Sequence, residues 1–263
     1  MKMSPDNKIE IRPASTLILM RSTDRVEDNV EFEVFMLRRN LNSDFVGGAF
    51  VFPGGGVLAD DFDEKILKRC INFSAEINDS KFKLERGGSI GYFVAAIRET
   101  FEEAGILVGL AEHNNNIDFD EYRSRLNSKE IMFSEFLEAE DIYLDLSTVY
   151  YFSHWTTPVG PPRRYSTRFF VSAIDPKFEL SHDNGETIEA KWINPKLALN
   201  LYEKGEFEII FPTARNLEKL VVYKTRTEVV ENVSKYDNIL ETVPRIIADG
   251  DEIKILIPGD EGY

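Results

Sequence analysis

The segment from Gly91 to Gly105 predicts a helix with acidic side chains on one side and apolar side chains on the other. Because a helix turns by about 100° per residue, Glu99, Glu102 and Glu103 share one face. Gly105 supplies the left-handed residue at which such a helix ends. The opposite side is apolar, with Phe93, Ile97, Phe101 and Ala104. Such a helix packs one face into a core and presents its carboxylates on the other.

Three carboxylates so close together repel one another unless water or a cation lies among them. A hard cation such as Mg²⁺ or Mn²⁺ suits a set of oxygen ligands. The alternative is a solvated face on an acidic protein, with Arg98 and Glu102 as an ordinary i, i+4 ion pair. The helix taken by itself leaves both interpretations open.

The charge of the chain argues against two classes of partner. It has 31 basic and 46 acidic residues, a net charge of -15, which would repel a nucleic-acid backbone or an anionic membrane. Its one cysteine, Cys70, excludes an internal disulfide and fits a reducing compartment. We recognise no transmembrane stretch, no signal peptide and no Ser-Lys-Leu address in residues 261–263. We therefore expect a cytoplasmic protein without nucleic-acid or membrane partners.

Hydrophobic patterning predicts alternating strands and helices. The charged stretch 22–31 suits an exposed connection, and 72–90 is polar and irregular. A short amphipathic helix is expected from Phe62, with Cys70 on its apolar stripe. The predicted strands are 14–20, 32–38, 106–108, 142–155, 164–174, 186–193 and 252–257. The other predicted helices are 118–138, 195–202 and 213–233.

This helix and a second segment, residues 52–55, together resemble the signature of a known family. Residues 98–106, Arg-Glu-Thr-Phe-Glu-Glu-Ala-Gly-Ile, resemble the second half of the Nudix signature, Gly-x5-Glu-x7-Arg-Glu-U-x-Glu-Glu-x-Gly-U, where U is apolar. Residues 52–55, Phe-Pro-Gly-Gly, resemble the entry to that signature, which makes Gly55 its leading glycine. Gly55 and Arg98 are 43 positions apart instead of 14, so about 29 residues are inserted. Ile90 therefore takes the slot of the first glutamate, for which Asp60 or Asp61 is the candidate replacement.

An insertion at this point resembles the subgroup of peroxisomal coenzyme A diphosphatases and their bacterial relatives. Two more segments agree with that subgroup, residues 153–158 with 163–170, and residues 186–192. The resemblance implies an α/β Nudix fold, an α/β/α sandwich around a mixed β-sheet. We expect a single domain over 1–263, with an inserted helical segment at 62–90 and a C-terminal helical extension at 205–263.

The resemblance also implies a chemistry, the metal-dependent hydrolysis of a diphosphate linkage in a nucleotide derivative. Mg²⁺ or Mn²⁺ would neutralise the phosphates and lower the pKa of the attacking water. Arg98 would orient a box glutamate, and Glu186 or Glu189 would act as general base, although each also fits an exposed position beside a turn. The expected metal ligands are Glu99, Glu102 and Glu103, with Asp60 or Asp61.

Several residues are candidates for substrate binding. Gly54 and Gly55 would let the backbone approach the metal site. The basic residues Arg163, Arg164 and Arg168 would grip a phosphate, or would pair with surface carboxylates. His154 would stack on a base or bond to it, or would serve as a structural residue at a strand end.

The substrate is less specified than the chemistry. Coenzyme A or an acyl derivative is the first expectation, with ADP-ribose, NADH or another dinucleotide as the alternative. Some relatives carry an arginine eight residues ahead of the phenylalanine of Phe-Pro-Gly-Gly, where this chain has Asp44. A different class, a non-catalytic module that senses a nucleotide, has no need for three mutually repelling carboxylates. The sequence leaves open whether the chain forms a homodimer.

Overall fold

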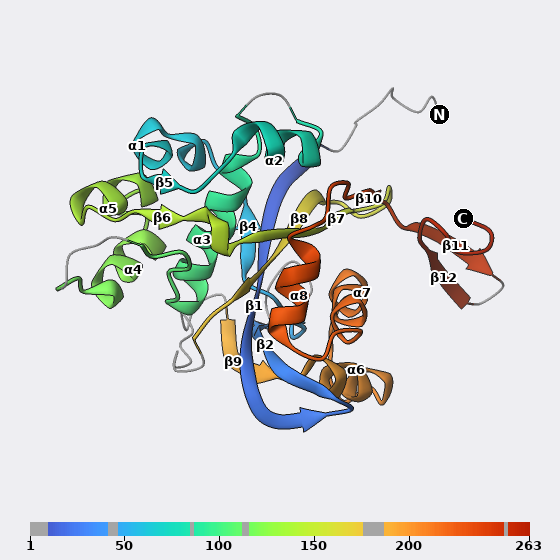
Figure 1. The fold of residues 1–263 in the computed structure, drawn as a ribbon. Helices are drawn as coiled ribbons and strands as arrows, with labels where there is room; N and C mark the ends of the chain where they lie inside the picture. Colours follow the sequence, from blue (N-terminus) through green and yellow to red (C-terminus); the bar gives the residue numbers. More distant parts are fainter. Residues whose placement is uncertain (1–9, 42–46, 85–86, 112–115, 176–186, 250–251) are drawn as a thin grey trace, which may run out of the picture.

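The computed structural model describes residues 10–41, 47–84, 87–111, 116–175, 187–249 and 252–263. Within these ranges an eight-stranded mixed sheet forms the centre of the molecule (Figure 1). Six strands follow the order β10-β7-β8-β1-β2-β3, while β4 pairs with β1 and β9 with β2. Strand β1 runs parallel to β8 and antiparallel to β2. The strands are β1 (Ile11–Glu27), β2 (Val30–Arg39), β3 (Phe50–Val51), β4 (Gly54–Gly56), β7 (Tyr150–Thr156), β8 (Arg164–Ala173), β9 (Thr187–Ile193) and β10 (Glu241–Thr242).

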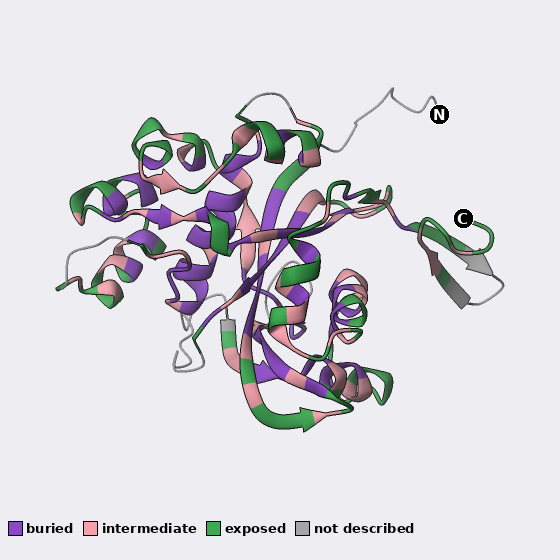
Figure 2. Ribbon diagram, viewed as in Figure 1, coloured by how far each residue is buried: buried purple, intermediate pink, exposed green. Residues whose placement is uncertain are grey.

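Helices cover both faces of this sheet (Figures 1 and 2). Strand β1 alternates between the two cores, because Leu17 and Leu19 belong to one apolar cluster, and Ile18 and Met20 to the other. The first core includes residues of α3 (Ile90–Ala104), α4 (Phe119–Asn127) and α5 (Phe133–Ala139). The second includes residues of α6 (Pro195–Glu203), α7 (Phe211–Leu220) and α8 (Arg226–Val233). The predicted α/β/α sandwich around a mixed sheet is thereby confirmed.

The inserted residues 62–90 pack onto α3. They contain α1 (Glu64–Leu67), the short strand β5 (Cys70–Ile71), which pairs with β6 (Leu144–Asp145), and α2 (Ala75–Phe82). The expectation of irregular structure over 72–90 was therefore wrong for α2. The hydrophobic periodicity of α2 is too weak to indicate a helix. Phe82 is buried against Phe93, with 5.7 Å between the ring centroids, so tertiary packing stabilises the helix in place of the local pattern. Gly91 lies so close to the ring of Phe62 that a Cβ at this position would stand 2.6 Å from Phe62 Cε2.

Other boundaries differ from the prediction for local reasons. Strand β1 continues through the charged stretch to Glu27, because Asp28 and Asn29 form a tight turn at positive φ. Residues 106–108 are buried but not a strand, since the chain turns at Gly109. The helix predicted over 118–138 is divided into α4 and α5. The helix predicted over 213–233 is divided into α7 and α8, and Thr225 caps the second.

The C-terminal residues continue past α8 into β10 and then the hairpin of β11 (Arg245–Asp249) and β12 (Glu252–Leu256). This hairpin extends from the body of the molecule beyond β10 (Figure 1). The sequence predicted its second strand only. None of the described helices is long and apolar enough to cross a bilayer.

Candidate active site

Helix α3 carries the acidic side chains and ends where the sequence predicts. Gly105 follows it at φ 72° and donates its N–H to Phe101 O. Phe93, Ile97 and Phe101 are buried in the core. The remaining C-terminal carbonyls are reached from α4, because Arg123 donates from Nε to Glu102 O (2.9 Å) and from Nη2 to Glu103 O (2.6 Å).

Arg98 is buried at the centre of the polar face, with 3% of the residue exposed. Its Nη2 donates to Gly56 O (2.8 Å), so it joins the helix to β4. Its Nη1 donates to Glu99 Oε1 (2.8 Å) and to Glu102 Oε2 (3.2 Å). One guanidinium thus contacts two of the three box carboxylates through charge-assisted hydrogen bonds.

The glycine segment lies against the same carboxylates, despite the long insertion. Strand β4 pairs with residues 14–16 of β1, and Gly54 N donates to Glu103 Oε2 (2.9 Å). A Cβ at Gly55 would stand 2.6 Å from Glu99 Oε2. Since that contact excludes any side chain, residue 55 must be glycine for Glu99 to keep its place. The two separated halves of the predicted motif therefore meet in space.

The two aspartates after the glycines have different partners. Asp61 is completely buried and accepts from Arg98 Nε (2.8 Å) and Leu58 N (2.7 Å). Asp60 accepts from both the backbone N–H and the hydroxyl of Ser134 in α5. The structure therefore brings Asp61 to the box helix through Arg98, and directs Asp60 away toward α5.

The electrostatics of the acidic face suit a cation. Burial raises the pKa of Glu99 to about 7, opposed by Arg98 and reinforced by the nearby charge of Glu102. Among the described residues, no three acidic, histidine or cysteine side chains converge on one point as they stand. In this arrangement Arg98 and Gly54 N donate hydrogen bonds to oxygens of these carboxylates. A desolvated cluster with more carboxylates than neighbouring cations nevertheless fits an oxygen-preferring divalent ion.

A row of residues crosses four strands next to this cluster. Register places Ser15 of β1 beside Gly55 on one side and Arg168 of β8 on the other, and His154 of β7 follows. Two strand spacings, roughly 10 Å, separate Gly55 from Arg168. Ser15 Oγ and Arg168 Nε are buried without a partner among the described residues. His154 Nε2 lies 2.7 Å from Ser166 Oγ.

Aromatic rings of the insertion and of α3 hold the Arg168 side chain, which sequence reasoning did not foresee. The guanidinium carbon lies 4.1 Å from the ring centroid of Tyr92 and 5.3 Å from that of Phe82. Burial and the charge of Arg168 lower the pKa of His154 to about 4, so this imidazole is neutral at neutral pH. The signal in the sequence for these contacts was the group of aromatic residues between 82 and 93, which includes Phe82 and Tyr92.

The remaining candidates lie apart from this row or outside the described residues. Arg164 donates from Nε to Thr157 O (3.0 Å) at the end of the β7–β8 hairpin, and Arg163 precedes it as an exposed residue. Glu189 in β9 is within 3.1 Å of Lys191 Nζ and 3.8 Å of Arg38 Nη1. Glu186, the other candidate base, lies outside the described residues.

Comparison with known proteins agrees with this geometry. The "NUDT19 Nudix domain" family matches residues 11–220. The acyl-coenzyme A diphosphatase NUDT19 of Xenopus laevis is 26% identical over 272 residues, 89% of this chain and 72% of that protein. The putative nudix hydrolase 7 of Caenorhabditis elegans is 25% identical over 260 residues, 96% and 74% of the two chains. The crystal structure of a NUDIX hydrolase from Alicyclobacillus acidocaldarius superposes with a TM-score of 0.72 at 25% identity, covering 85% of this chain and 97% of that one.

The fold, the divided signature and these similarities define the class of the protein. It is a Nudix pyrophosphohydrolase, as the acidic helix and the glycine segment predict. Within that class, the chain belongs to the NUDT19 Nudix domain family.

Proposed function

We propose that this protein is a divalent-metal-dependent hydrolase that cleaves the diphosphate linkage of coenzyme A or an acyl-coenzyme A. The observation that carries this is the contact between the two halves of the motif, in which Glu99 lies against Gly55 and Glu103 accepts from Gly54 N. The names of the Xenopus and chicken relatives, acyl-coenzyme A diphosphatase, support the choice of substrate.

In this proposal the three box glutamates Glu99, Glu102 and Glu103 hold Mg²⁺ or Mn²⁺. Such an ion, when bound, neutralises phosphate charge and lowers the pKa of a coordinated water. Arg98 keeps Glu99 and Glu102 in place, and Asp61 keeps Arg98 in place through a buried ion pair. Asp60 is left out of the metal set, because its two oxygens accept hydrogen bonds from Ser134.

Substrate contacts follow from the row across the sheet. The backbone at Gly54 and Gly55 admits a phosphate close to the glutamates, because no side chain intervenes. Arg168, whose Nε lacks a partner among the described residues, binds a phosphate oxygen. Neutral His154 beside it donates or accepts a hydrogen bond to the nucleotide. Glu186 and Glu189 remain the candidates for the general base, to be separated by glutamine substitution at each.

A substrate panel with Mg²⁺ or Mn²⁺ tests the proposal. Coenzyme A and dodecanoyl-coenzyme A should release phosphopantetheine or its acyl derivative at higher kcat/KM than ADP-ribose or NADH release AMP. Faster AMP release would keep the enzyme class and change the substrate. Turnover of no diphosphate, together with nucleotide binding, would instead support the non-catalytic sensor and contradict the proposal.

A further inference from the structure

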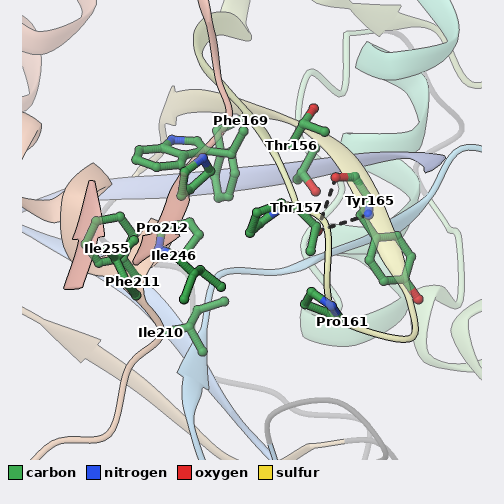
Figure 3. A pocket seen from close by; sticks show the side chains of 14 residues that line it. Thr156, Thr157, Pro161, Tyr165, Phe169, Ile210, Phe211, Pro212, Ile246 and Ile255 are labelled. Carbon is green, nitrogen blue, oxygen red and sulfur yellow. Dashed lines mark hydrogen bonds between the residues drawn. The ribbon is translucent and has the colours of Figure 1, made fainter. Parts of the chain in front are cut away.

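A cavity lies on the side of the sheet opposite α3, and Figure 3 shows the side chains that line it. Its volume is about 320 Å³, within the range of roughly 300–1,000 Å³ that small-molecule sites occupy. The walls come from the β7–β8 hairpin, the start of α7 and the C-terminal hairpin β11–β12. They include Trp155, Phe169, Phe211, Ile246 and Ile255.

The position of the cavity separates it from the box glutamates. Phe169 lines the cavity and belongs to the core beneath α6 to α8, whereas the next residue, Phe170, belongs to the core beneath α3. Successive side chains of a strand point to opposite faces. The cavity and the acidic face of α3 are therefore on opposite sides of the same strand.

The chemistry of the walls selects for an apolar ligand. Most lining side chains are aromatic, aliphatic or proline, and two of the polar ones bond to each other, since Tyr165 N donates to Thr157 Oγ1 (3.1 Å). The indole of Trp155 forms part of the wall, and its Nε1 is buried with no partner among the described residues. An acceptor atom on a ligand in the cavity would supply the hydrogen bond that this N–H lacks.

The residues that line the cavity carry no charged side chain. Arg164 and Arg245 are next to lining residues in sequence, but along β8 and β11 they alternate with those residues and point to the opposite face. The Arg164 Nε donates to Thr157 O, and Arg245 stacks over Tyr263, 4.5 Å from the ring centroid. The cavity therefore favours an uncharged, apolar ligand chain.

We propose that this cavity binds the hydrocarbon chain of an acyl group, the part that a free fatty acid and an acyl-coenzyme A share. The apolar walls enclose the chain, while Trp155 Nε1 donates to the carboxylate or thioester carbonyl oxygen at its end. Where the chain belongs to a substrate, the inference rests on the proposed function. Where it belongs to a free fatty acid, the inference is independent of catalysis.

Tryptophan fluorescence tests binding without reference to activity. The chain has two tryptophans, so Trp192→Phe leaves Trp155 in the cavity wall as the only reporter. Dodecanoate should change the emission of Trp155 saturably. Ile246→Glu, which puts a carboxylate into this half-exposed part of the wall, should weaken that binding by at least about tenfold, because the bound hydrocarbon chain would displace water from the charge. Ile247→Glu is the matched control, since this exposed neighbour does not line the cavity and binding should persist.

Hydrolysis then distinguishes the two sources. If the substrate supplies the chain, Ile246→Glu should lower kcat/KM for dodecanoyl-coenzyme A and leave unacylated coenzyme A unchanged. If dodecanoate binds but both substrates are hydrolysed as before, the cavity takes a free fatty acid. The proposal is wrong if dodecanoate leaves Trp155 emission unchanged. It is equally wrong if the wild type is a dimer that Ile246→Glu dissociates without any dodecanoate binding, because the cavity would then be a contact between copies.

Discussion

The carboxylate of Glu99 rests directly on the α-carbon of Gly55, so that a Cβ at position 55 would stand 2.6 Å from Glu99 Oε2. The two residues are 44 positions apart in sequence and belong to different elements, β4 and α3. This contact fixes the acidic face of the helix against the glycine segment.

Gly55→Ala should therefore displace Glu99 and reduce hydrolysis strongly, with a loss of stability of about 1–3 kcal/mol from overpacking. Gly56→Ala is the matched control, because a Cβ there has no atom within 4 Å. Steady-state kinetics and urea denaturation of both variants check this. Equal activity in the two variants would show that the contact has no functional role.

Glu102→Gln should abolish hydrolysis while leaving the fold intact. The amide keeps the shape of the side chain, which is partly exposed, but it is a far weaker metal ligand than a carboxylate. The loss of kcat should exceed the roughly 10- to 100-fold that loss of an outer-shell partner costs. Circular dichroism and kinetics give the comparison, and activity within a few-fold of wild type would remove Glu102 from the metal set.

Asp61→Asn should destabilise the protein by about 3–5 kcal/mol, because it leaves the buried Arg98 without its strongest partner. The same change should lower activity, since Arg98 is then free to shift toward Glu99 and Glu102. Asp60→Asn, in the adjacent residue bound to Ser134, should retain activity. Thermal unfolding and steady-state kinetics of the two variants check this. A larger loss of stability and activity in Asp60→Asn than in Asp61→Asn would contradict the roles given to the two aspartates.

His154 should make the protein less stable in acid. Its pKa falls from 6.5 in the unfolded chain to about 4 in the fold, where it faces Ser166, Arg168 and Glu241. Because the unfolded state binds this proton first, stability is lost as the pH drops from 6.5 to 4. His154→Gln should lose less stability over that window in urea denaturation at stepped pH. A pH-independent difference between the two proteins would contradict the shift.

The sequence specified the parts of the fold that local patterns control. The helix ending at Gly105, its apolar face and the strands beneath it are in the predicted places, because their periodicity agrees with their burial. Helix α2 escaped prediction, since Phe82 is fixed by rings distant in sequence. The partners of Asp60 and Asp61 could not be predicted from the sequence either. The two aspartates are adjacent and chemically identical, and only the tertiary fold brings Ser134 to one and Arg98 to the other.

Manganese titration of the metal-free protein tests the central claim most directly. Calorimetry should find saturable Mn²⁺ binding to the wild type, weakened by at least about tenfold in Glu99→Gln and in Glu102→Gln, as loss of a carboxylate ligand requires. Binding that is absent from the wild type at millimolar Mn²⁺, or unchanged in both variants, would contradict a catalytic cation on the acidic face of α3.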